Sequence, residues 1–314
     1  MKITEIIDEE YADATKKDGE QIALTKTSKT FQEIHKLYLF WLEDSYADWG
    51  FDPWSCFYAE KMLTENRKEE LYSMEDITNF CFAIKKFEEH KKFKESGAFL
   101  SALINVHYEK TKSSKEYILV TEHLQIPLDE LCSYTKGANI LVQGNGGTNA
   151  CNQIKKGRIH FTGSVGRSLC SCTTGGTVII DGDCENNACF GMEETNLLIK
   201  GNAGNSIGYS TSKKGKIIVN GNVGKYAGHF CYGGKIHIKG DAEEEAGSQM
   251  VEGVLRIDGT CGKNVGSKMQ GGKIFLNEYE SISGDIKKGK IYCKNKQIYP
   301  QTILDRIWQH IRKE

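Results

Sequence analysis

From residue 138 onward, apolar residues return at a fixed interval that is much longer than the period of one helix or strand. Successive units are 19, 19, 19, 20, 19, 19 and 19 residues long, and a shorter unit follows at Gly289. Such self-similarity at a fixed period indicates a repeat architecture. The units open at Ala138, Gly157, Gly176, Thr195, Gly215, Gly234, Gly253 and Gly272.

Stacked on one another, the units share two apolar columns. The third position reads Ile140, Ile159, Val178, Leu197, Ile217, Ile236, Leu255 and Ile274. The fifth position reads Val142, Phe161, Ile180, Ile199, Val219, Ile238, Ile257 and Leu276. Two apolar columns that lie two residues apart are typical of the buried face of a strand.

Glycine fills the seventh position of seven consecutive units, and a turn-forming Asn, Ser, Asp or Thr follows it. A glycine that ends each strand predicts a corner where the backbone has a positive φ or approaches another segment closely. The column contains Gly144, Gly163, Gly182, Gly201, Gly221, Gly240 and Gly259.

One strand per unit, with no helical pattern between the strands, predicts a mostly β fold, a parallel β-helix of about 8–9 coils over residues 113–299. A unit of this length gives a perimeter of roughly 60 Å, and the stacked coils give a rod about 40 Å long. Lys225, Glu244 and Lys263 share a column on adjacent coils, and opposite charges side by side across strands favour this register.

The two ends of the chain differ from the repeat. Residues 1–112 contain little glycine and many aromatic and charged residues, with Phe31, Ile34 and Tyr38 at helical spacing, which predicts a helical domain. Apolar residues from Ile303 to Ile311 also recur at helical spacing, so residues 300–314 are predicted to form a C-terminal capping helix.

Composition narrows the class of protein. The net charge of −1 gives no excess of positive charge for nucleic acid or an anionic membrane. No apolar run is long enough to span a membrane, and the first residues do not resemble a secretory signal. Eleven cysteines without such a signal favour free thiols in a reducing compartment, so we expect a cytoplasmic protein.

The repeat carries a resemblance to a known module. The segment from Gly215 to Gly228 reads Gly-Lys-Ile-Ile-Val-Asn-Gly-Asn-Val-Gly and ends in a further glycine. This pattern resembles the glycine-repeat (GXGXG) β-helix at the C-terminus of the glutamate synthase large subunit and in the β-helical subunit of formylmethanofuran dehydrogenase. The resemblance covers residues 140–285. It implies a right-handed β-helix that docks neighbouring catalytic domains, and it brings no catalytic residues to this chain.

Cysteines form the first candidate site. Cys151, Cys170 and Cys189 occupy the fourteenth position on three adjacent coils, and Cys172 lies two residues beyond Cys170. Such a ladder of thiols could bind a soft metal or react with an oxidant. The simpler interpretation is that the column requires a small residue, because the next four units place glycine there.

Carboxylates and histidines form the second candidate set. Asp181 and Asp258 share an outward column but lie four coils apart, ~19 Å at strand spacing, which is too far for joint action on one bond. The pair Asp183 and Asp241 lies three coils apart. The histidines in one column, His160 and His237, are also four coils apart, His229 stands alone, and the Glu243–Glu245 run fits a solvated turn.

Two further features have ordinary explanations. The segment from Gly144 to Gly147 superficially resembles a phosphate loop, but no helix follows it and the repeat accounts for its glycines. Trp41, Trp49 and Trp54, with the neighbouring tyrosines Tyr38, Tyr46 and Tyr58, are either a partner-binding groove or, by preference, the core of the helical domain.

Together these patterns predict a non-catalytic scaffold or docking subunit without catalytic, cofactor-binding or metal-binding residues. We expect its partner to be another protein, such as an oxidoreductase or synthase, or a second copy of this chain. Two alternatives stay open. A β-helix enzyme acting on carbohydrate requires an acidic groove on one sheet, and a metal or redox protein would use the stacked cysteines.

Overall fold

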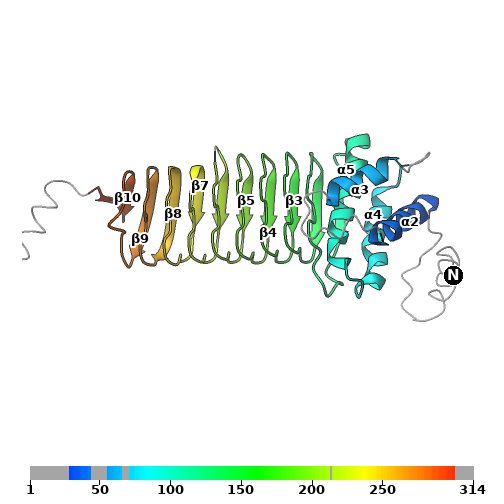
Figure 1. The fold of residues 1–314 in the computed structure, drawn as a ribbon, viewed down its shortest axis with the longest axis horizontal. Helices are drawn as coiled ribbons and strands as arrows, with labels where there is room; N and C mark the ends of the chain where they lie inside the picture. The colour runs from blue at the N-terminus through cyan, green and yellow to red at the C-terminus, as the bar shows by residue number, and fades with distance from the viewer. Residues whose placement is uncertain (1–27, 44–54, 66–70, 213, 301–314) are drawn as a thin grey trace, which may run out of the picture.

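The computed structural model describes residues 28–43, 55–65, 71–212 and 214–300. In these ranges the chain is a long rod with helices gathered at one end (Figure 1). The last helix ends at Thr111 and the first strand begins at Glu116. Buried side chains from Phe31 to Ile291 form one continuous hydrophobic cluster, so the helices and the rod share a core.

The helical region contains four helices and two 3₁₀ turns among its described residues: α2 (Lys29–Glu43), α3 (Ser55–Glu65), α4 (Met74–Ala83), η2 (Ile84–Phe87), η3 (Phe93–Glu95) and α5 (Ser96–Thr111). Helix α4 begins with a capping box. The Ser73 hydroxyl accepts a hydrogen bond from the Asp76 backbone at 3.0 Å, and the Asp76 carboxylate accepts one from the Ser73 backbone at 2.8 Å. None of the described helices is long and apolar enough to cross a membrane.

Aromatic side chains build the core of this region. Tyr38 packs edge-on against Phe80 and Phe99, with ring centroids 5.1 and 5.2 Å apart, and Trp41 packs against Phe99 at 5.7 Å. The core interpretation is therefore confirmed for Tyr38 and Trp41, and Tyr58 packs partly buried against the same core. The other three members of that set, Tyr46, Trp49 and Trp54, lie outside the described residues.

The rod is a parallel β-solenoid of about nine turns. Ten of the described strands pair in parallel in chain order, and the predicted columns are in register, since Ile140 pairs with Ile159, which pairs with Val178. The strands are β1 (Glu116–Val120), β2 (Asn139–Gln143), β3 (Arg158–Phe161), β4 (Thr177–Ile180), β5 (Asn196–Ile199), β6 (Lys216–Val219), β7 (Tyr232–Ile238), β8 (Glu252–Cys261), β9 (Lys273–Tyr279) and β10 (Lys290–Cys293).

Close backbone approach, rather than a positive φ, explains the glycine column. Within it only Gly144 has a positive φ, of 125°. At Gly221, an added Cβ would lie 2.5 Å from the Asn202 side-chain oxygen and 2.6 Å from the Gly201 carbonyl oxygen of the preceding turn. A side chain larger than hydrogen would therefore separate the stacked turns at this corner.

The residues after these glycines form a ladder of side-chain hydrogen bonds, which we call the corner ladder. The Asn202 side-chain oxygen accepts from the Asn222 backbone at 2.9 Å, and the Asn222 oxygen accepts from the Asp241 backbone at 2.8 Å. Each member thus satisfies a backbone donor of the following turn. The ladder contains Asn145, Ser164, Asp183, Asn202, Asn222 and Asp241.

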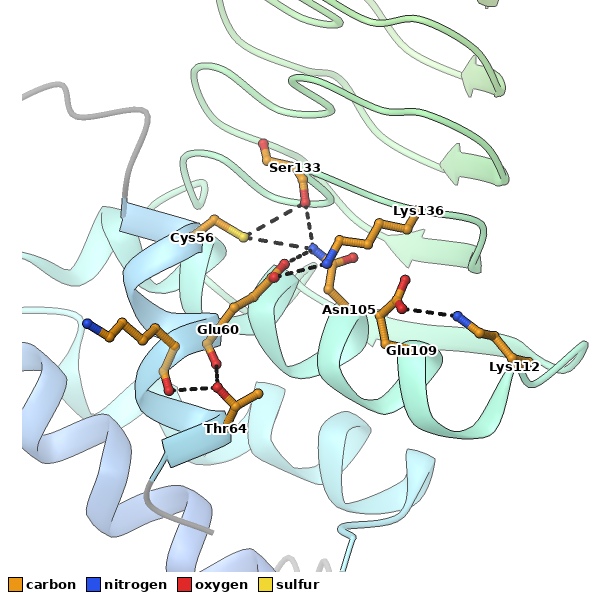
Figure 2. A network of polar contacts seen from close by, with 9 residues as sticks. Cys56, Glu60, Thr64, Asn105, Glu109, Lys112, Ser133 and Lys136 are labelled. Atoms are coloured by element: carbon orange, nitrogen blue, oxygen red, sulfur yellow. Dashed lines mark hydrogen bonds and ion pairs between the residues drawn. The ribbon is translucent and has the colours of Figure 1, made fainter.

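Helix α5 closes the N-terminal end of the solenoid. Asn105 donates to the Ser133 carbonyl oxygen at 3.1 Å and to Glu60 at 2.8 Å, and Glu60 also forms an ion pair with Lys136 at 3.2 Å (Figure 2). The Ser101 hydroxyl donates to the Glu130 carbonyl oxygen at 3.0 Å. These contacts satisfy acceptors of the first turn, which has no preceding turn to pair with.

The opposite end is closed differently. Strand β10 turns back through Lys294 and Asn295, with φ angles of 47° and 65°, into the antiparallel strand β11 (Lys296–Tyr299). Strand β11, and not a capping helix, therefore covers this end of the solenoid among the described residues. The C-terminal helix was predicted for residues 300–314, of which 301–314 lie outside the described residues.

Candidate interaction surface

The stacked cysteines lie inside the solenoid. Cys151, Cys170 and Cys189 are completely buried, and Cys132 of the first turn continues their column. Burial raises the pKa of the Cys151 and Cys189 thiols well above the usual value, so these thiols stay protonated and are poor nucleophiles and metal ligands. No group of three or more His, Cys, Asp or Glu in the described ranges is arranged to hold a metal ion.

The conformation of this column explains its composition. All four cysteines have a positive φ, between 58° and 65°, and so do the four glycines that continue the column, at 70° to 72°. An added Cβ at Gly247 would lie 2.4 Å from the Ile274 Cδ1 atom. Small side chains are therefore required here. Sequence reasoning missed Cys132 because the strand of the first turn lies out of the 19-residue spacing: Tyr117 pairs with Ile140, which lies 23 residues further along the chain.

Histidines and aspartates pair across neighbouring turns. The His160 Nε2 atom lies 3.0 Å from Asp181, and the His237 Nε2 atom lies 2.6 Å from Asp258. Lys200 and Arg256 complete the two clusters, at 2.8 and 2.6 Å from their carboxylates. The comparison of residues within single columns missed these diagonal contacts, which join one turn to the next.

The charge state of these clusters suits a structural link. Hydrogen bonding from Lys200 and His160 lowers the pKa of Asp181. Burial raises the pKa of Asp258, but hydrogen bonds from His237 and Arg256 outweigh it and leave this pKa below its usual value. Within the described residues, neither histidine hydrogen-bonds to a serine, threonine or cysteine that could act as a nucleophile.

The remaining candidates are part of the repeat. Asp183 and Asp241 belong to the corner ladder. Glu244 pairs with Lys225 at 2.6 Å, as the column predicted, whereas Lys263 lies 3.9 Å from Glu280. The backbone donors of Gly146 and Gly147 are bound to carbonyl oxygens of the neighbouring turns and are not free to hold a phosphate group.

His229 is the centre of a partly exposed group of aromatic rings that we call the aromatic ridge: Phe190, Tyr209, Tyr226, His229 and Phe230. The Phe190 and Tyr209 rings stack with centroids 5.2 Å apart and planes 14° apart. The His229 ring then contacts Tyr209 at 5.3 Å, Phe230 at 4.5 Å and Tyr226 at 5.6 Å. The ridge runs across three successive turns on one edge of the solenoid.

The ridge is uncharged. Gln249 lies 3.2 Å from the His229 Nε2 atom, and burial lowers the pKa of His229, although Glu245 partly opposes this shift. The imidazole is therefore neutral at physiological pH. Phe190, at the end of the stack, keeps 46% of its surface exposed. An uncharged, aromatic and solvent-accessible surface is suited to burial against a partner.

The backbone makes aromatic residues costly at two of these positions. Tyr226 and Phe230 have φ angles of 63° and 51°, in the left-handed region that bulky side chains rarely adopt. Most other turns place Asn, Ser, Gln, Cys or Gly at the same positions of the repeat, although the first turn places Tyr134, with a φ of 59°, at the position of Phe230. Because the left-handed conformation costs roughly 1–2 kcal/mol in a residue of this kind, the aromatic rings are not explained by the fold alone.

A sequence signal for the ridge was present. The fifteenth position of the repeat reads Phe190, Tyr209 and His229 in three successive units, whereas the two units before them and the two after them place Asn or Ser there. This column was not among those on which the sequence prediction relied.

Comparison with known proteins identifies no family. No protein-family model matches the chain, and no curated protein matches it significantly.

Proposed function

We propose that this protein is a non-catalytic scaffold or docking subunit that binds a protein partner through the aromatic ridge. The observation that carries the proposal is the ridge itself, five partly exposed, mutually contacting rings on one edge of a rigid rod. Aromatic residues are enriched at the energetic centres of protein interfaces. The rings are partly solvated in the isolated chain, so a partner that covers them gains hydrophobic free energy.

The rest of the solenoid supports a structural role. Its stacked cysteines Cys151, Cys170 and Cys189 are buried, His160 and His237 are bonded to aspartates, and the corner acids Asp183 and Asp241 bond to the backbone of the next turn. The resemblance of the repeat to the glutamate synthase β-helix module adds two finer proposals. The solenoid is right-handed, and the partner is a catalytic subunit of an oxidoreductase or synthase complex.

The test compares three forms of the tagged full-length chain in native lysate. These are the unmodified protein, the double variant Phe190→Ser with Tyr209→Ser, and the control variant Tyr232→Ser. Tyr232 is 48% exposed and lies outside the ridge. We expect a stoichiometric partner with the unmodified and control proteins, and at least tenfold less with the ridge variant, because interface aromatic residues contribute about 2 kcal/mol or more.

Light scattering of the purified proteins covers the case in which the partner is a second copy. Dimers of the unmodified and control proteins that dissociate in the ridge variant would support docking through the ridge between copies. Equal recovery of the same partner by all three proteins would show that the ridge is not the docking surface. A monomeric protein without a stoichiometric partner would overturn the scaffold proposal.

A further inference from the structure

A hollow of about 320 Å³ is lined by residues of β8, β9 and β10 and of the turn that follows β10. These strands lie at the end of the rod away from the helices (Figure 1). The lining of the hollow includes the paired residues Phe275 and Tyr292, which form its apolar wall, and Asp258, Asn277 and Lys294, two positions further along their turns, which form its polar wall. Its volume is at the lower end of the range for small-ligand sites. The hollow is far along the rod from the helical end and is separate from the aromatic ridge.

The apolar wall is a pair of stacked rings. The centroids of Phe275 and Tyr292 lie 4.8 Å apart and their planes differ by 10°. The same outward column carries Leu141, Ile179 and Leu198 in earlier turns. The stacked rings therefore occur in this column only where the hollow forms, and they provide a flat apolar surface beside it.

The polar wall contains both donors and acceptors. The Asp258 carboxylate is held by Arg256 and His237, each at 2.6 Å, which orients its oxygen atoms toward fixed positions. The side-chain amides of Asn277 and Asn295 have no hydrogen-bond partner among the described residues. Asn295 lies in the turn between β10 and β11, so the reversal of the chain supplies this part of the wall.

The charges of the hollow are balanced. Arg256 is paired with Asp258, and Lys294 lies 3.4 Å from Glu278. An anionic ligand such as a phosphate compound would have to compete with these carboxylates for the two cations. The free amides, by contrast, can donate to and accept from hydroxyl groups. The chemistry of the hollow therefore favours an uncharged, hydroxyl-rich ligand with an apolar ring face.

We infer that this hollow binds the sugar rings of a neutral oligosaccharide. The stacked Phe275 and Tyr292 rings contact the apolar C–H surface of the sugar, while Asp258, Asn277 and Asn295 hydrogen-bond to its hydroxyl groups. Asp258 is the only carboxylate that lines the hollow within the described residues. Glycosidases require a pair of carboxyl groups, so the inference is of binding without cleavage.

The experiment is titration calorimetry of the purified full-length protein with cellotetraose, maltotetraose and chitotetraose as neutral probes. Tetragalacturonate and inorganic phosphate are the anionic comparisons. We expect one of the neutral probes to bind with a dissociation constant of about 1 mM or tighter. The variants Tyr292→Ala and Asn277→Ala should each weaken that binding at least fivefold, and Tyr232→Ala should leave it unchanged.

Circular dichroism melts of each variant separate lost binding from lost folding, and the exposed Asn277 side chain is the less disruptive site. The inference is overturned if none of the neutral probes binds at about 10 mM, or if only an anionic probe binds. It is also overturned if the neutral probe binds folded Asn277→Ala and folded Tyr292→Ala as tightly as the unmodified protein.

Discussion

The two ends of the solenoid are closed by different means. At the N-terminal end, α5 lies almost wholly buried and its side chains bond to carbonyl oxygens of the first turn. At the other end, β11 pairs with β10 by ordinary strand hydrogen bonds, only in the antiparallel direction. Side chains in fixed positions make most of the bonds of the first closure, beside one backbone bond from Asp129 to Lys94, and backbone bonds make most of those of the second, beside the Tyr299 hydroxyl.

This difference has a physical consequence. A side-chain closure tolerates few substitutions, because each buried donor or acceptor left without a partner costs free energy. A backbone closure is less sensitive, because the strand hydrogen bonds do not depend on the identity of the side chains. We therefore expect the N-terminal end to be the more sensitive to substitution, and three comparisons between matched residues test this expectation.

The largest difference in stability between the two ends is expected from glycine substitution. An added Cβ at Gly97 of α5 would lie 2.1 Å from the Asp129 carbonyl oxygen, whereas nothing lies within 4 Å of one at Gly284. Gly97→Ala should destabilise the protein by roughly 1–3 kcal/mol, the usual cost of overpacking. Gly284→Ala should leave the melting temperature unchanged or raise it slightly. Equal melting temperatures for the two variants would contradict the comparison.

A smaller effect is expected from single hydrogen bonds. Asn105→Ala removes a buried donor of α5 that bonds to the Ser133 carbonyl oxygen of the first turn and to Glu60, and it should cost about 1–3 kcal/mol because these acceptors lose a partner. Tyr299→Phe removes the hydrogen bond from the Tyr299 hydroxyl to the Ile286 carbonyl oxygen, 2.8 Å long and only partly buried, and should cost about 0.5–1.5 kcal/mol. Urea unfolding measures both. A larger cost for Tyr299→Phe would reverse our ranking of the two ends.

The smallest effect concerns two aspartates at opposite ends. Burial raises the pKa of Asp129, so its contribution to stability is present below its usual value of 3.8 and is lost as the pH rises through the folded-state pKa. Hydrogen bonds from Ser283 and the Lys268 backbone lower the pKa of Asp285. The contribution of Asp285 is therefore present above its usual pKa and is lost as the pH falls through the folded-state value.

Unfolding free energies from pH 3 to 6 check these signs. The advantage of the unmodified protein over Asp129→Asn should shrink as the pH rises, and its advantage over Asp285→Asn should grow. If both differences change in the same direction with pH, the electrostatic contrast between the ends is wrong.

The repeat could be predicted from sequence because each inward position of the strand recurs in many successive units, and an apolar residue occupies it each time. The register of Ile140, Ile159 and Val178, and the corner position of the glycines, followed from that repetition. The reason for the glycines was only partly predicted. Close approach to the preceding turn, and not a positive φ, excludes a side chain at Gly221.

Features without repetition were harder to predict. The bond between His160 and Asp181 joins different columns on different turns, so the search within single columns did not find it. The contacts of Asn105 with Ser133 and Glu60 connect segments with no shared pattern. The aromatic ridge combines three repeat positions, and its members contact one another only because those positions share one edge of the rod.

The corner ladder repeats the same hydrogen bond at the same place in successive turns, so it makes the length of the solenoid a multiple of one turn. The inner turns of the ladder accept and donate equivalent bonds at their two faces, so we expect that one such turn can be removed or duplicated without leaving an unmatched surface. Such a change between the helices and Phe190 would move the aromatic ridge by ~4.8 Å relative to the helical end. The number of turns therefore sets the distance at which this chain presents its ridge, in steps about as wide as one strand spacing.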